Sequence, residues 1–255
     1  MRILIHTGDW GWRNLGDVAM AQVAVRRLAR LWPQARLDVM TNSEERLQKF
    51  CPGTFPVPAA GQMRWLAERP AFGGRLYKLL VPSWMRTPAA KVEAYLRRRW
   101  PRLAYGAVRM AESARPPERR TMTAFYEALF NADLLVFSGA HDITSAYEPG
   151  ALRILALHRL AGRLGTRTAL FGQGLGPIRS ERVLETARAV LPRAELIAIR
   201  EKRTGLTLLD TIGVERNHVM VTGDDALELA YTENGNGPGR GIGINLRCAP
   251  YSAVD

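Results

Sequence analysis

The chain is poor in cysteine and has no long apolar run, and each shortage excludes a class of protein. Its 255 residues include only two cysteines, Cys51 and Cys248, which are isolated and lack metal-ligand spacing, so we predict free buried thiols and no metal site. No apolar run approaches the ~18–20 residues of a membrane-spanning helix. The apolar stretch at the N-terminus, around Ile3–Ile5, is too short for a signal peptide. We therefore expect a cytoplasmic protein.

Acidic residues are scarce in one part of the chain in particular. The whole sequence has 36 Lys and Arg against 24 Asp and Glu, a net charge of +12. Residues 61–120 hold 14 of these basic residues but 4 of the acidic ones, a local net charge of +10. Such a block predicts an anionic partner, which could be a membrane surface, a nucleic acid or a phosphorylated substrate. An ordinary solvated helix face is the alternative.

Aromatic residues are interleaved with the arginines of this basic block, whose helical pattern is interrupted by proline and glycine. Its densest part is Arg97, Arg98, Arg99 and Trp100. Helices with arginines on one side and tryptophans on the other suit the interface of an anionic bilayer, so we expect these four residues at a membrane surface. The same mixture suits single-stranded nucleic acid. No recognised nucleic-acid motif accompanies it, so we expect no nucleic-acid partner.

Outside the basic block, short apolar strands alternate with helical patterns. Arg2–His6 and Arg36–Met40 are the first predicted strands, and a helix is predicted over Val18–Leu31 between them. Continuous apolar runs are typical of strands buried on both faces, and short connections predict parallel strands with right-handed crossovers. We predict an α/β protein. Residues 1–233 would form a Rossmann-like parallel sheet with helices on both faces, and residues 61–120 a basic aromatic helical insertion.

The stretch Thr168–Pro177 gives the main indication of a ligand. An apolar strand, Thr168–Phe171, leads into the glycine-rich loop GQGLGP. Glycine lets the backbone approach a ligand closely, and the amide groups at the start of a following helix favour an anion. A tight turn without a ligand is the alternative. Gln173 is the one polar side chain of the loop, and we expect it to hydrogen-bond a ligand.

Polar residues and glycines follow four consecutive predicted strands. Because the carboxyl ends of parallel strands meet at one edge of a sheet, these clusters should converge and form a ligand site. The clusters are Ser138-Gly139, Gly172-Gln173-Gly174, Arg200-Glu201 and Gly223-Asp224-Asp225.

A glycine-rich segment predicts a domain boundary near the end of the chain. Residues 234–240 have the composition of a linker, and Gly241–Arg247 forms one more predicted strand. A single strand cannot bury its own faces. We therefore expect residues 241–255 to begin a second, truncated α/β domain. An added edge strand of the first sheet is the alternative.

Taken in order, these clusters resemble the polysaccharide pyruvyl transferase family. The resemblance implies a fold like that of GT-B glycosyltransferases, of which this chain would hold the first half, with a ligand cleft between two Rossmann-like halves. The chain departs from the family at Ala140-His141-Asp142, where further glycines are usual. The matching segments are Asn14-Leu15-Gly16-Asp17, Ala132-Asp133 with Ser138-Gly139, Gly172–Pro177, Ile199-Arg200-Glu201, Thr222–Ala226 and Gly243–Arg247.

The resemblance also implies a reaction. An enolpyruvyl unit would pass from phosphoenolpyruvate, as donor substrate and without any cofactor, to hydroxyls of a saccharide, which gives a pyruvate ketal. The acceptor would be a cell-surface polysaccharide or its lipid-linked precursor, so the basic block would lie against the inner face of the cytoplasmic membrane. A GT-B glycosyltransferase that uses a nucleotide sugar, and a non-catalytic module that binds a membrane or an acidic polymer, are the alternatives.

The donor carries a carboxylate and a phosphate, and the planar guanidinium of arginine binds both in a bidentate manner. Arg200 and Arg247 each lie at the carboxyl end of a predicted strand and are the candidates for donor binding. The alternative for Arg200 is an ion pair with Glu201 or Asp224 that orders the edge of the sheet. The alternative for Arg247 is an exposed strand end.

Ketal formation needs an acid for the methylene carbon and a base for the acceptor hydroxyl. Asp224 and Asp225 are candidates because the charge of one carboxylate favours protonation of its neighbour, with a helix N-cap as the alternative. His141 is the candidate proton shuttle. A helix cap is an equal alternative for Asp17, which we otherwise expect to bind a sugar hydroxyl. The substrate-binding candidates besides the two arginines are Asn14, Gly16, Asp17, Gly139, Gln173, Gly174 and Glu201.

Overall fold

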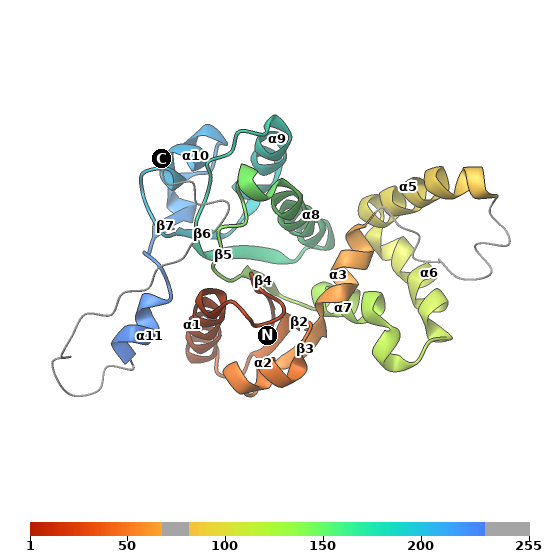
Figure 1. The fold of residues 1–255 in the computed structure, drawn as a ribbon, viewed down its shortest axis with the longest axis horizontal. Coiled ribbons are helices and arrows are strands. Elements are labelled where there is room, and N and C mark those ends of the chain that lie inside the picture. Colours follow the sequence, from red (N-terminus) through yellow and green to blue (C-terminus); the bar gives the residue numbers. More distant parts are fainter. Residues whose placement is uncertain (68–81, 233–255) are drawn as a thin grey trace.

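The computed structural model describes residues 1–67 and 82–232, and seven of its segments form one parallel β-sheet (Figure 1). The strands are β1 (Arg2–His6), β2 (Arg36–Thr41), β3 (Phe55–Pro58), β4 (Leu134–Phe137), β5 (Arg167–Gln173), β6 (Leu196–Ile199) and β7 (Val219–Val221). Their order across the sheet is β3-β2-β1-β4-β5-β6-β7, and every neighbouring pair is parallel. The predicted Rossmann-like α/β class is confirmed.

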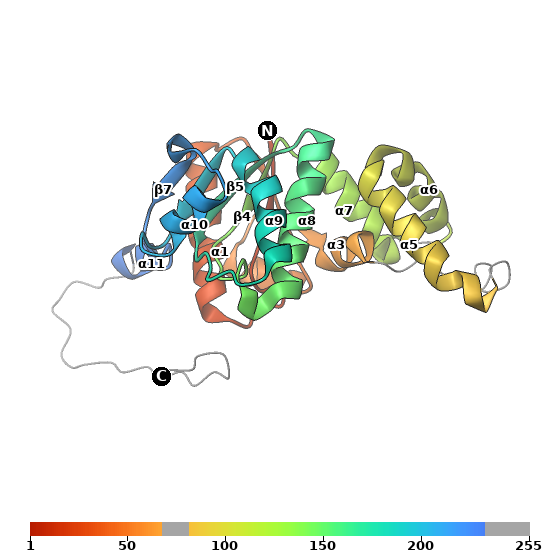
Figure 2. The ribbon, with the colours of Figure 1, turned by 90° about the horizontal axis from the view of Figure 1, so that it is seen from above.

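Helices connect the strands and cover both faces of the sheet, as Figure 2 shows from above. Chain reversal between parallel strands requires such crossovers. The helices of the first half are α1 (Leu15–Leu31), α2 (Glu44–Phe50), α3 (Ala59–Leu66), α5 (Ser83–Arg99), α6 (Pro101–Ser113) and α7 (Thr121–Phe130). Those of the second half are α8 (Glu148–Leu164), α9 (Glu181–Val190), α10 (Gly205–Thr211) and α11 (Leu227–Thr232).

Alternate side chains of each central strand enter two separate hydrophobic cores. In β1, Ile3 and Ile5 point to the core under α1 and α2, whereas Leu4 points to the core under α3, α7, α8 and α9. All three side chains are fully buried. Burial of one such side chain stabilises the fold by roughly 1.5–3 kcal/mol. This explains why β1 is a continuous apolar run.

Helix α3 belongs to the core, although its sequence lies at the start of the basic block. A Cβ atom at Gly61 would lie 2.0 Å from the carbonyl oxygen of Thr121, so only glycine allows α3 to approach α7 this closely. Trp65 is fully buried, and its ring centroid lies 4.8 Å from that of Tyr126. The part of the block that projects from the sheet is the helix pair α5 and α6 (Figure 1).

Arg97 joins α5 to the end of α3, and this contradicts its prediction as a membrane-facing residue. Its side chain is 1% exposed. Its guanidinium donates to the carbonyl oxygens of Trp65 at 3.1 Å and Ala67 at 2.8 Å, and it also pairs with Glu93. The last carbonyl groups of a helix have no partner within the helix, so the buried cation satisfies groups that α3 leaves open.

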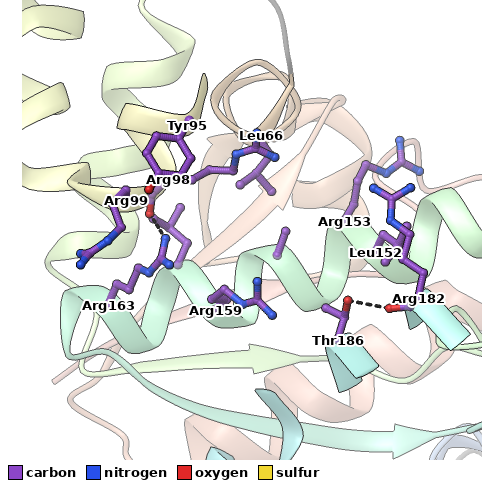
Figure 3. A pocket seen from close by; sticks show the side chains of 12 residues that line it. Leu66, Tyr95, Arg98, Arg99, Leu152, Arg153, Arg159, Arg163, Arg182 and Thr186 are labelled. Carbon is purple, nitrogen blue, oxygen red and sulfur yellow. Dashed lines mark hydrogen bonds between the residues drawn. The ribbon is translucent and has the colours of Figure 1, made fainter. Parts of the chain in front are cut away.

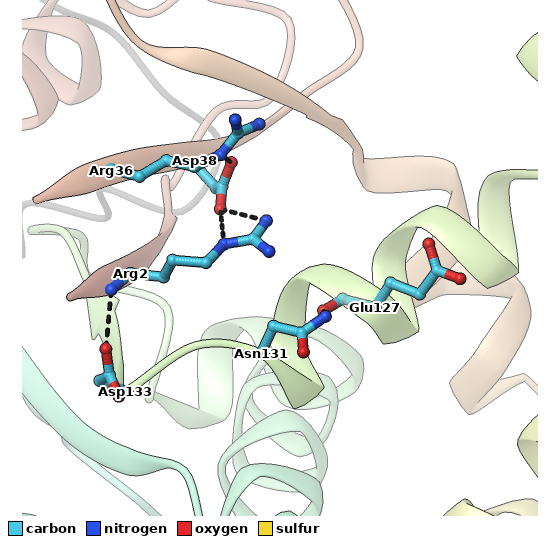
Figure 4. A network of polar contacts seen from close by, with 6 residues as sticks. All are labelled: Arg2, Arg36, Asp38, Glu127, Asn131 and Asp133. Carbon is cyan, nitrogen blue, oxygen red and sulfur yellow. Dashed lines mark hydrogen bonds and ion pairs between the residues drawn. The ribbon is translucent and has the colours of Figure 1, made fainter.

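The amino edge of the sheet is held by structural ion pairs (Figure 4). Asp38 of β2 is buried and accepts from Arg2 Nη2 at 2.9 Å and from Arg36 Nε at 2.9 Å. The backbone N–H of Arg2 donates to Asp133 at 2.7 Å, which ties β1 to the start of β4. The charges at the amino edge of the sheet are therefore mutually satisfied.

Among the residues described, none of the helices has both the length and the hydrophobicity needed to span a bilayer.

Candidate active site

A cavity of about 1100 Å³ lies at the carboxyl edge of the sheet. The residues around it come from the segments that follow β1, β4, β5, β6 and β7, so the predicted convergence of strand ends is confirmed. The charged and polar residues that line it are Asn14, Asp17, His141, Asp142, Thr144, Ser145, Tyr147, Arg179, Arg200 and Asp224.

The loops after β4 and β5 are joined by backbone hydrogen bonds and form one wall of this cavity. The N–H of Gly174 donates to the carbonyl oxygen of Ala140 at 2.8 Å, and the N–H of Ser145 donates to that of Pro177 at 3.1 Å. An isolated parallel bridge between Ile143 and Leu175 lies between these two bonds. The glycine-rich loop is therefore held in place by protein contacts before any ligand binds.

Gly174 makes room for two side chains of the site. A Cβ atom at this position would lie 2.2 Å from Nδ1 of His141 and 2.8 Å from Nη2 of Arg200. Contacts below 3 Å are not available to a real Cβ, so the absence of a side chain lets His141 and Arg200 approach the same point of the backbone. The glycine acts here by positioning protein groups that line the cavity.

Gly139, a predicted substrate-binding residue, and Gly172 of the glycine-rich loop act in packing. A Cβ atom at Gly139 would lie 2.5 Å from Sδ of Met20, and one at Gly172 would lie 2.4 Å from Oδ2 of Asp225. Neither glycine lines the cavity. Their positions bring α1 and the segment after β7 close to the sheet edge.

Arg200 and Asp224 form an ion pair with 3.0 Å between Nη1 and Oδ2. Asp224 also accepts the backbone N–H of Ala226 through Oδ1 at 3.0 Å. Both alternatives considered from sequence are therefore realised, since Asp224 pairs with Arg200 and also caps the turn before α11. Both side chains still line the cavity.

Asp225 does not line this cavity, so the structure gives no support to its predicted catalytic role. It is 3% exposed, and its Oδ1 accepts from Nη1 of Arg27 at 2.7 Å. Arg27 of α1 also pairs with Glu228 of α11. The two neighbouring aspartates therefore make different contacts, and of the two only Asp224 lines the cavity.

Gln173 and Glu201 do not line the cavity either, so the structure gives no support to their prediction as substrate-binding residues. Nε2 of Gln173, which is 3% exposed, donates to the carbonyl oxygens of Phe137 at 3.3 Å and Phe171 at 3.1 Å. Glu201 accepts the backbone N–H of Gly205 at 2.9 Å and so caps α10. Hydrogen bonds from Thr204 and Gly205 hold the pKa of Glu201 below its usual range.

Asn14 and Gly16 line the cavity at the start of α1. Asn14 is the N-cap of this helix, because its side-chain oxygen accepts the N–H of Gly16 at 3.2 Å. Its amide nitrogen donates to Oδ2 of Asp17 at 2.9 Å. The cap is thus Asn14, and Asp17 lies in the first turn with its carboxylate at the cavity.

Asp17 is the carboxylate of the site that is best suited to exchange a proton near neutral pH. Burial raises its pKa to about 6, and the negative charges of Asp142 and Asp9 act in the same direction. The hydrogen bond from Asn14 and the charge of Arg200 oppose this rise. The sequence suggested only sugar binding or helix capping for this residue.

Two further cavity residues, Asp142 and Arg179, were not predicted from the sequence. Burial raises the pKa of Asp142, and the nearby positive charges of His141, Arg153 and Arg200 oppose the rise. Arg179 is exposed and follows the glycine-rich loop directly after Ile178. Asp142 follows β4 and Arg179 follows β5. Because both strands were predicted from the sequence, the position of these two residues at the carboxyl edge could have been predicted as well.

The remaining predicted residues lie elsewhere. Arg98 and Arg99 line a separate groove beside α8, and Trp100 is 47% exposed at the end of α5. Arg247, the linker 234–240 and the predicted strand Gly241–Arg247 lie outside the described residues. Within residues 1–67 and 82–232, no group of three or more His, Cys, Asp and Glu side chains is arranged to hold a metal ion.

Comparisons with known proteins give one match. Neither the curated proteins nor the solved structures contain a match to this chain. A sequence model of a family described as polysaccharide pyruvyl transferase matches residues 14–252, which is nearly the whole chain. This range begins at the N-cap residue of α1 and includes every segment that carried the resemblance. The chain therefore belongs to the polysaccharide pyruvyl transferase family, and it is a transferase whose general role is pyruvyl transfer.

Proposed function

We propose that phosphoenolpyruvate is the donor, that a pair of saccharide hydroxyls is the acceptor, and that the reaction takes place in the cavity at the carboxyl edge of the sheet. The observation that carries the proposal is the presence of two arginines and a carboxylate that titrates near neutral pH in one cavity. Arg179 and Arg200 provide positive charge, and Asp17, with a pKa of about 6, provides a transferable proton. No cofactor is needed for this chemistry.

Arg200 would bind the donor. The ion pair with Asp224 fixes one nitrogen of its guanidinium, and the side chain lines the cavity beside Gly174. A guanidinium held in one orientation loses little freedom when it binds a carboxylate or phosphate. Arg179 is exposed on the adjacent wall and would contact the second anionic group of the donor.

Asp17 would supply the proton for the methylene carbon of the donor. That carbon takes the proton, and the oxygen of the first acceptor hydroxyl bonds to the adjacent carbon, which still carries phosphate. The second hydroxyl oxygen then displaces inorganic phosphate from this carbon and completes the ketal. Of the two hydroxyl protons, one restores Asp17 and the other leaves with phosphate, so atoms and charges balance. His141, which lines the same cavity, would relay the hydroxyl protons.

The helix pair α5 and α6 would place the enzyme at an anionic membrane surface, where a lipid-linked acceptor is found. Trp84 and Leu103 are each 76% exposed, and Trp100 at their junction is 47% exposed. Arg99 lies beside Trp100, with its guanidinium carbon 5.6 Å from the ring centroid. Exposed aromatic and apolar side chains next to arginines suit the boundary between lipid headgroups and acyl chains.

The test is phosphate release from phosphoenolpyruvate with and without a saccharide acceptor. Release that requires the acceptor, together with a pyruvate ketal in the product, is expected. Arg200→Ala should lower the rate of release by about 100-fold, whereas Arg188→Ala, which replaces an exposed arginine of α9 outside the cavity, should leave it unchanged. Transfer from a nucleotide sugar, with no use of phosphoenolpyruvate, would contradict the proposal.

A further inference from the structure

A second cavity lies at the carboxyl edge of the sheet, next to the active-site cavity. Its volume is about 480 Å³, and most of the segments that line it follow β1, β2, β3 and β4. Asp142, Ala146 and Tyr147 line both cavities, so the loop after β4 forms their common border. Because Gln62 of α3 lies in its wall, we call it the Gln62 cavity. Its other polar and aromatic lining residues include His6, Asp9, Trp10, Asn42 and Arg153.

Three buried polar atoms at the Gln62 cavity have no hydrogen-bond partner among the described residues. They are Nε2 and Oε1 of Gln62 and Nε1 of Trp10. Gln62 is only 1% exposed, and both residues line the cavity. Buried polar groups of proteins are nearly always hydrogen-bonded, because a buried group without a partner destabilises the fold. The unpartnered amide and indole groups therefore indicate that a ligand supplies their partners.

The positions of Trp10 and Gln62 are set by the fold. The backbone N–H of Asn42 donates to the carbonyl oxygen of Trp10 at 2.8 Å, which ties the loop after β1 to the end of β2. The Trp10 ring also packs against the ring of His6, with 5.5 Å between the two centroids. Gln62 follows Gly61, the residue that allows α3 to approach α7 closely. The two unpartnered side chains are thus held at the cavity before any ligand binds.

The charged groups of the Gln62 cavity do not favour the anionic donor. Among the described residues that line it, Arg153 faces two carboxyl groups, those of Asp9 and Asp142. Arg153 lies on α8 and also lines the groove beside this helix (Figure 3). Burial favours protonation of Asp9, but hydrogen bonds from backbone N–H groups of its own loop hold its pKa below its usual range. His6 is neutral near pH 7, because burial and the charge of Arg153 lower its pKa to about 4. A neutral ligand therefore fits this cavity better than phosphoenolpyruvate.

The unpartnered atoms also define the hydrogen bonds that the ligand must make. Nε2 of Gln62 and Nε1 of Trp10 donate, whereas Oε1 of Gln62 accepts. A carboxylate or phosphate dianion cannot donate to Oε1, and an ammonium group cannot accept from the indole N–H. Hydroxyl groups do both, and adjacent hydroxyls of a sugar ring match the planar amide. Trp10 and Tyr147 add the aromatic surface that is typical of sites for small molecules.

We propose that the Gln62 cavity binds a neutral sugar unit of the acceptor that does not itself receive the ketal, and that Gln62 and Trp10 select this unit. The assignment to the acceptor rests on the proposed function, whereas the binding of a saccharide rests on the cavity alone. The reacting hydroxyls lie in the active-site cavity, across the border that the loop after β4 forms. An acceptor that reaches both cavities must contain at least two sugar units, so Gln62 is a specificity-determining residue.

The test is an NMR titration of the full chain with methyl glycosides of glucose, galactose and mannose, and with disaccharides of the same sugars. At least one disaccharide should bind about tenfold or more tightly than the methyl glycosides of its two units. Gln62→Leu should lose this advantage. The control Gln34→Leu replaces an exposed glutamine before β2, at the opposite edge of the sheet, and should keep it. Equal binding by the two variants, or no saccharide binding by the wild type, would overturn the proposal.

Thermal unfolding separates a binding role of Gln62 from a structural one. Leucine is similar in size and has no polar atoms, so Gln62→Leu removes a buried group without a partner and should not lower the unfolding midpoint of the free chain. A lower midpoint would show that the amide serves the fold, and would overturn the proposal. Trp10→Phe keeps an aromatic ring and removes the indole N–H. This variant should also bind the disaccharide more weakly than the wild type does.

Steady-state phosphate release distinguishes this proposal from the proposed function. Gln62→Leu should raise KM for the disaccharide acceptor much more than it lowers kcat, because the residue contacts the unit that does not react. Release that Gln62→Leu leaves unaffected would overturn the subsite and leave the proposed function in place. Weaker binding of phosphoenolpyruvate in Gln62→Leu would assign the donor to this cavity and overturn the proposal. Saccharide binding that depends on Gln62, without any release from phosphoenolpyruvate, would contradict the proposed function and leave the cavity as a saccharide site.

Discussion

The guanidinium of Arg200 donates to Oδ2 of Asp224 at 3.0 Å, and this contact joins the carboxyl ends of β6 and β7. Arg200 is thereby held at the cavity before a ligand arrives. A preorganised cation binds an anionic substrate with a smaller loss of conformational freedom than a mobile one. Because β6 and β7 are neighbours in the sheet, Asp224 lies beside Arg200 and holds it in position to bind the donor.

Replacement of Arg200 should mainly weaken the use of the donor. We expect Arg200→Ala to lower kcat/KM for phosphoenolpyruvate by about 100-fold, because charge-assisted hydrogen bonds of roughly 1.5–3 kcal/mol are lost. Arg200→Lys should recover a small part of the activity, since an ammonium group cannot bind in a bidentate manner. Asp224→Asn keeps an acceptor for Arg200 and should cost less than tenfold. Steady-state kinetics of phosphate release measures all three, and equal losses in Arg200→Ala and Asp224→Asn would contradict this role.

Asp17 should control the pH dependence of activity. The pKa of Asp17 is about 6, so the plot of reaction rate against pH should have a limb near this value. In Asp17→Asn this limb should disappear, and kcat should fall by about 100-fold or more. Asn14→Ala removes the hydrogen bond to Asp17 that opposes the rise of its pKa, so the same limb should move to higher pH. A profile that is unchanged in both variants would exclude Asp17 as the proton carrier.

Gly174 should be intolerant of a side chain. In Gly174→Ala the new Cβ must displace His141 and Arg200, from which it would otherwise lie 2.2 Å and 2.8 Å away. We expect a rise in KM for the donor and a fall in kcat, with a smaller effect on the thermal midpoint. Gly162→Ala is the matched control, since nothing lies within 4 Å of its Cβ position in α8. That variant should keep full activity and gain up to about 1 kcal/mol of stability.

Arg97 should be a stability residue. Its removal breaks the ion pair with Glu93 and takes away the donor that Arg97 provides to the carbonyl groups of Trp65 and Ala67. We expect Arg97→Ala to lower the free energy of unfolding by about 3 kcal/mol, measured in urea. Arg99→Ala, from the same run of arginines but with an exposed side chain, should change it by less than about 0.5 kcal/mol. Equal destabilisation by the two variants would contradict the core role of Arg97.

The periodicity of the sequence was enough to predict the parallel sheet and the meeting of its carboxyl ends. It was not enough to predict which side chains face the cavity. Asp224 and Asp225 are neighbours in sequence, yet one faces the site and the other pairs with Arg27 of α1. That choice depends on a contact between residues about 200 positions apart, which no local pattern contains.

Burial was the second property that the sequence did not reveal. Arg97, Arg98 and Arg99 are chemically identical, but the turn of α5 places Arg97 against α3 and its two neighbours at a groove. Likewise, the raised pKa of Asp17 arises from burial and from Asp142, which belongs to the loop after another strand. Both effects require the packed arrangement of several elements, so a linear pattern predicts the residue type and not its role.

Two buried histidines should make the stability of the fold depend on pH. Burial lowers the pKa of His6 to about 4, with Arg153 acting in the same direction, and burial lowers that of His158 to about 4. Between about pH 4 and the ordinary value of 6.5, the unfolded chain binds more protons at these sites than the folded chain does. The free energy of unfolding should therefore rise with pH through this window. The stability that depends on the two neutral histidines should be lost as the pH falls to about 4.

His158 offers the sharper test, because its ring bonds to the hydroxyl of Thr168 at 2.8 Å and titrates far from the active site. In His158→Gln a side-chain amide can keep a bond to Thr168, and the slope of unfolding free energy against pH should fall by about half. Asp17 contributes the opposite sign between its ordinary value of 3.8 and about 6, since its raised pKa makes the folded chain bind the extra proton. Asp17→Asn should therefore steepen the rise of the free energy of unfolding with pH, whereas His158→Gln should reduce it. Urea titrations at several pH values measure this slope. A change of the slope in the same direction in both variants would contradict this account.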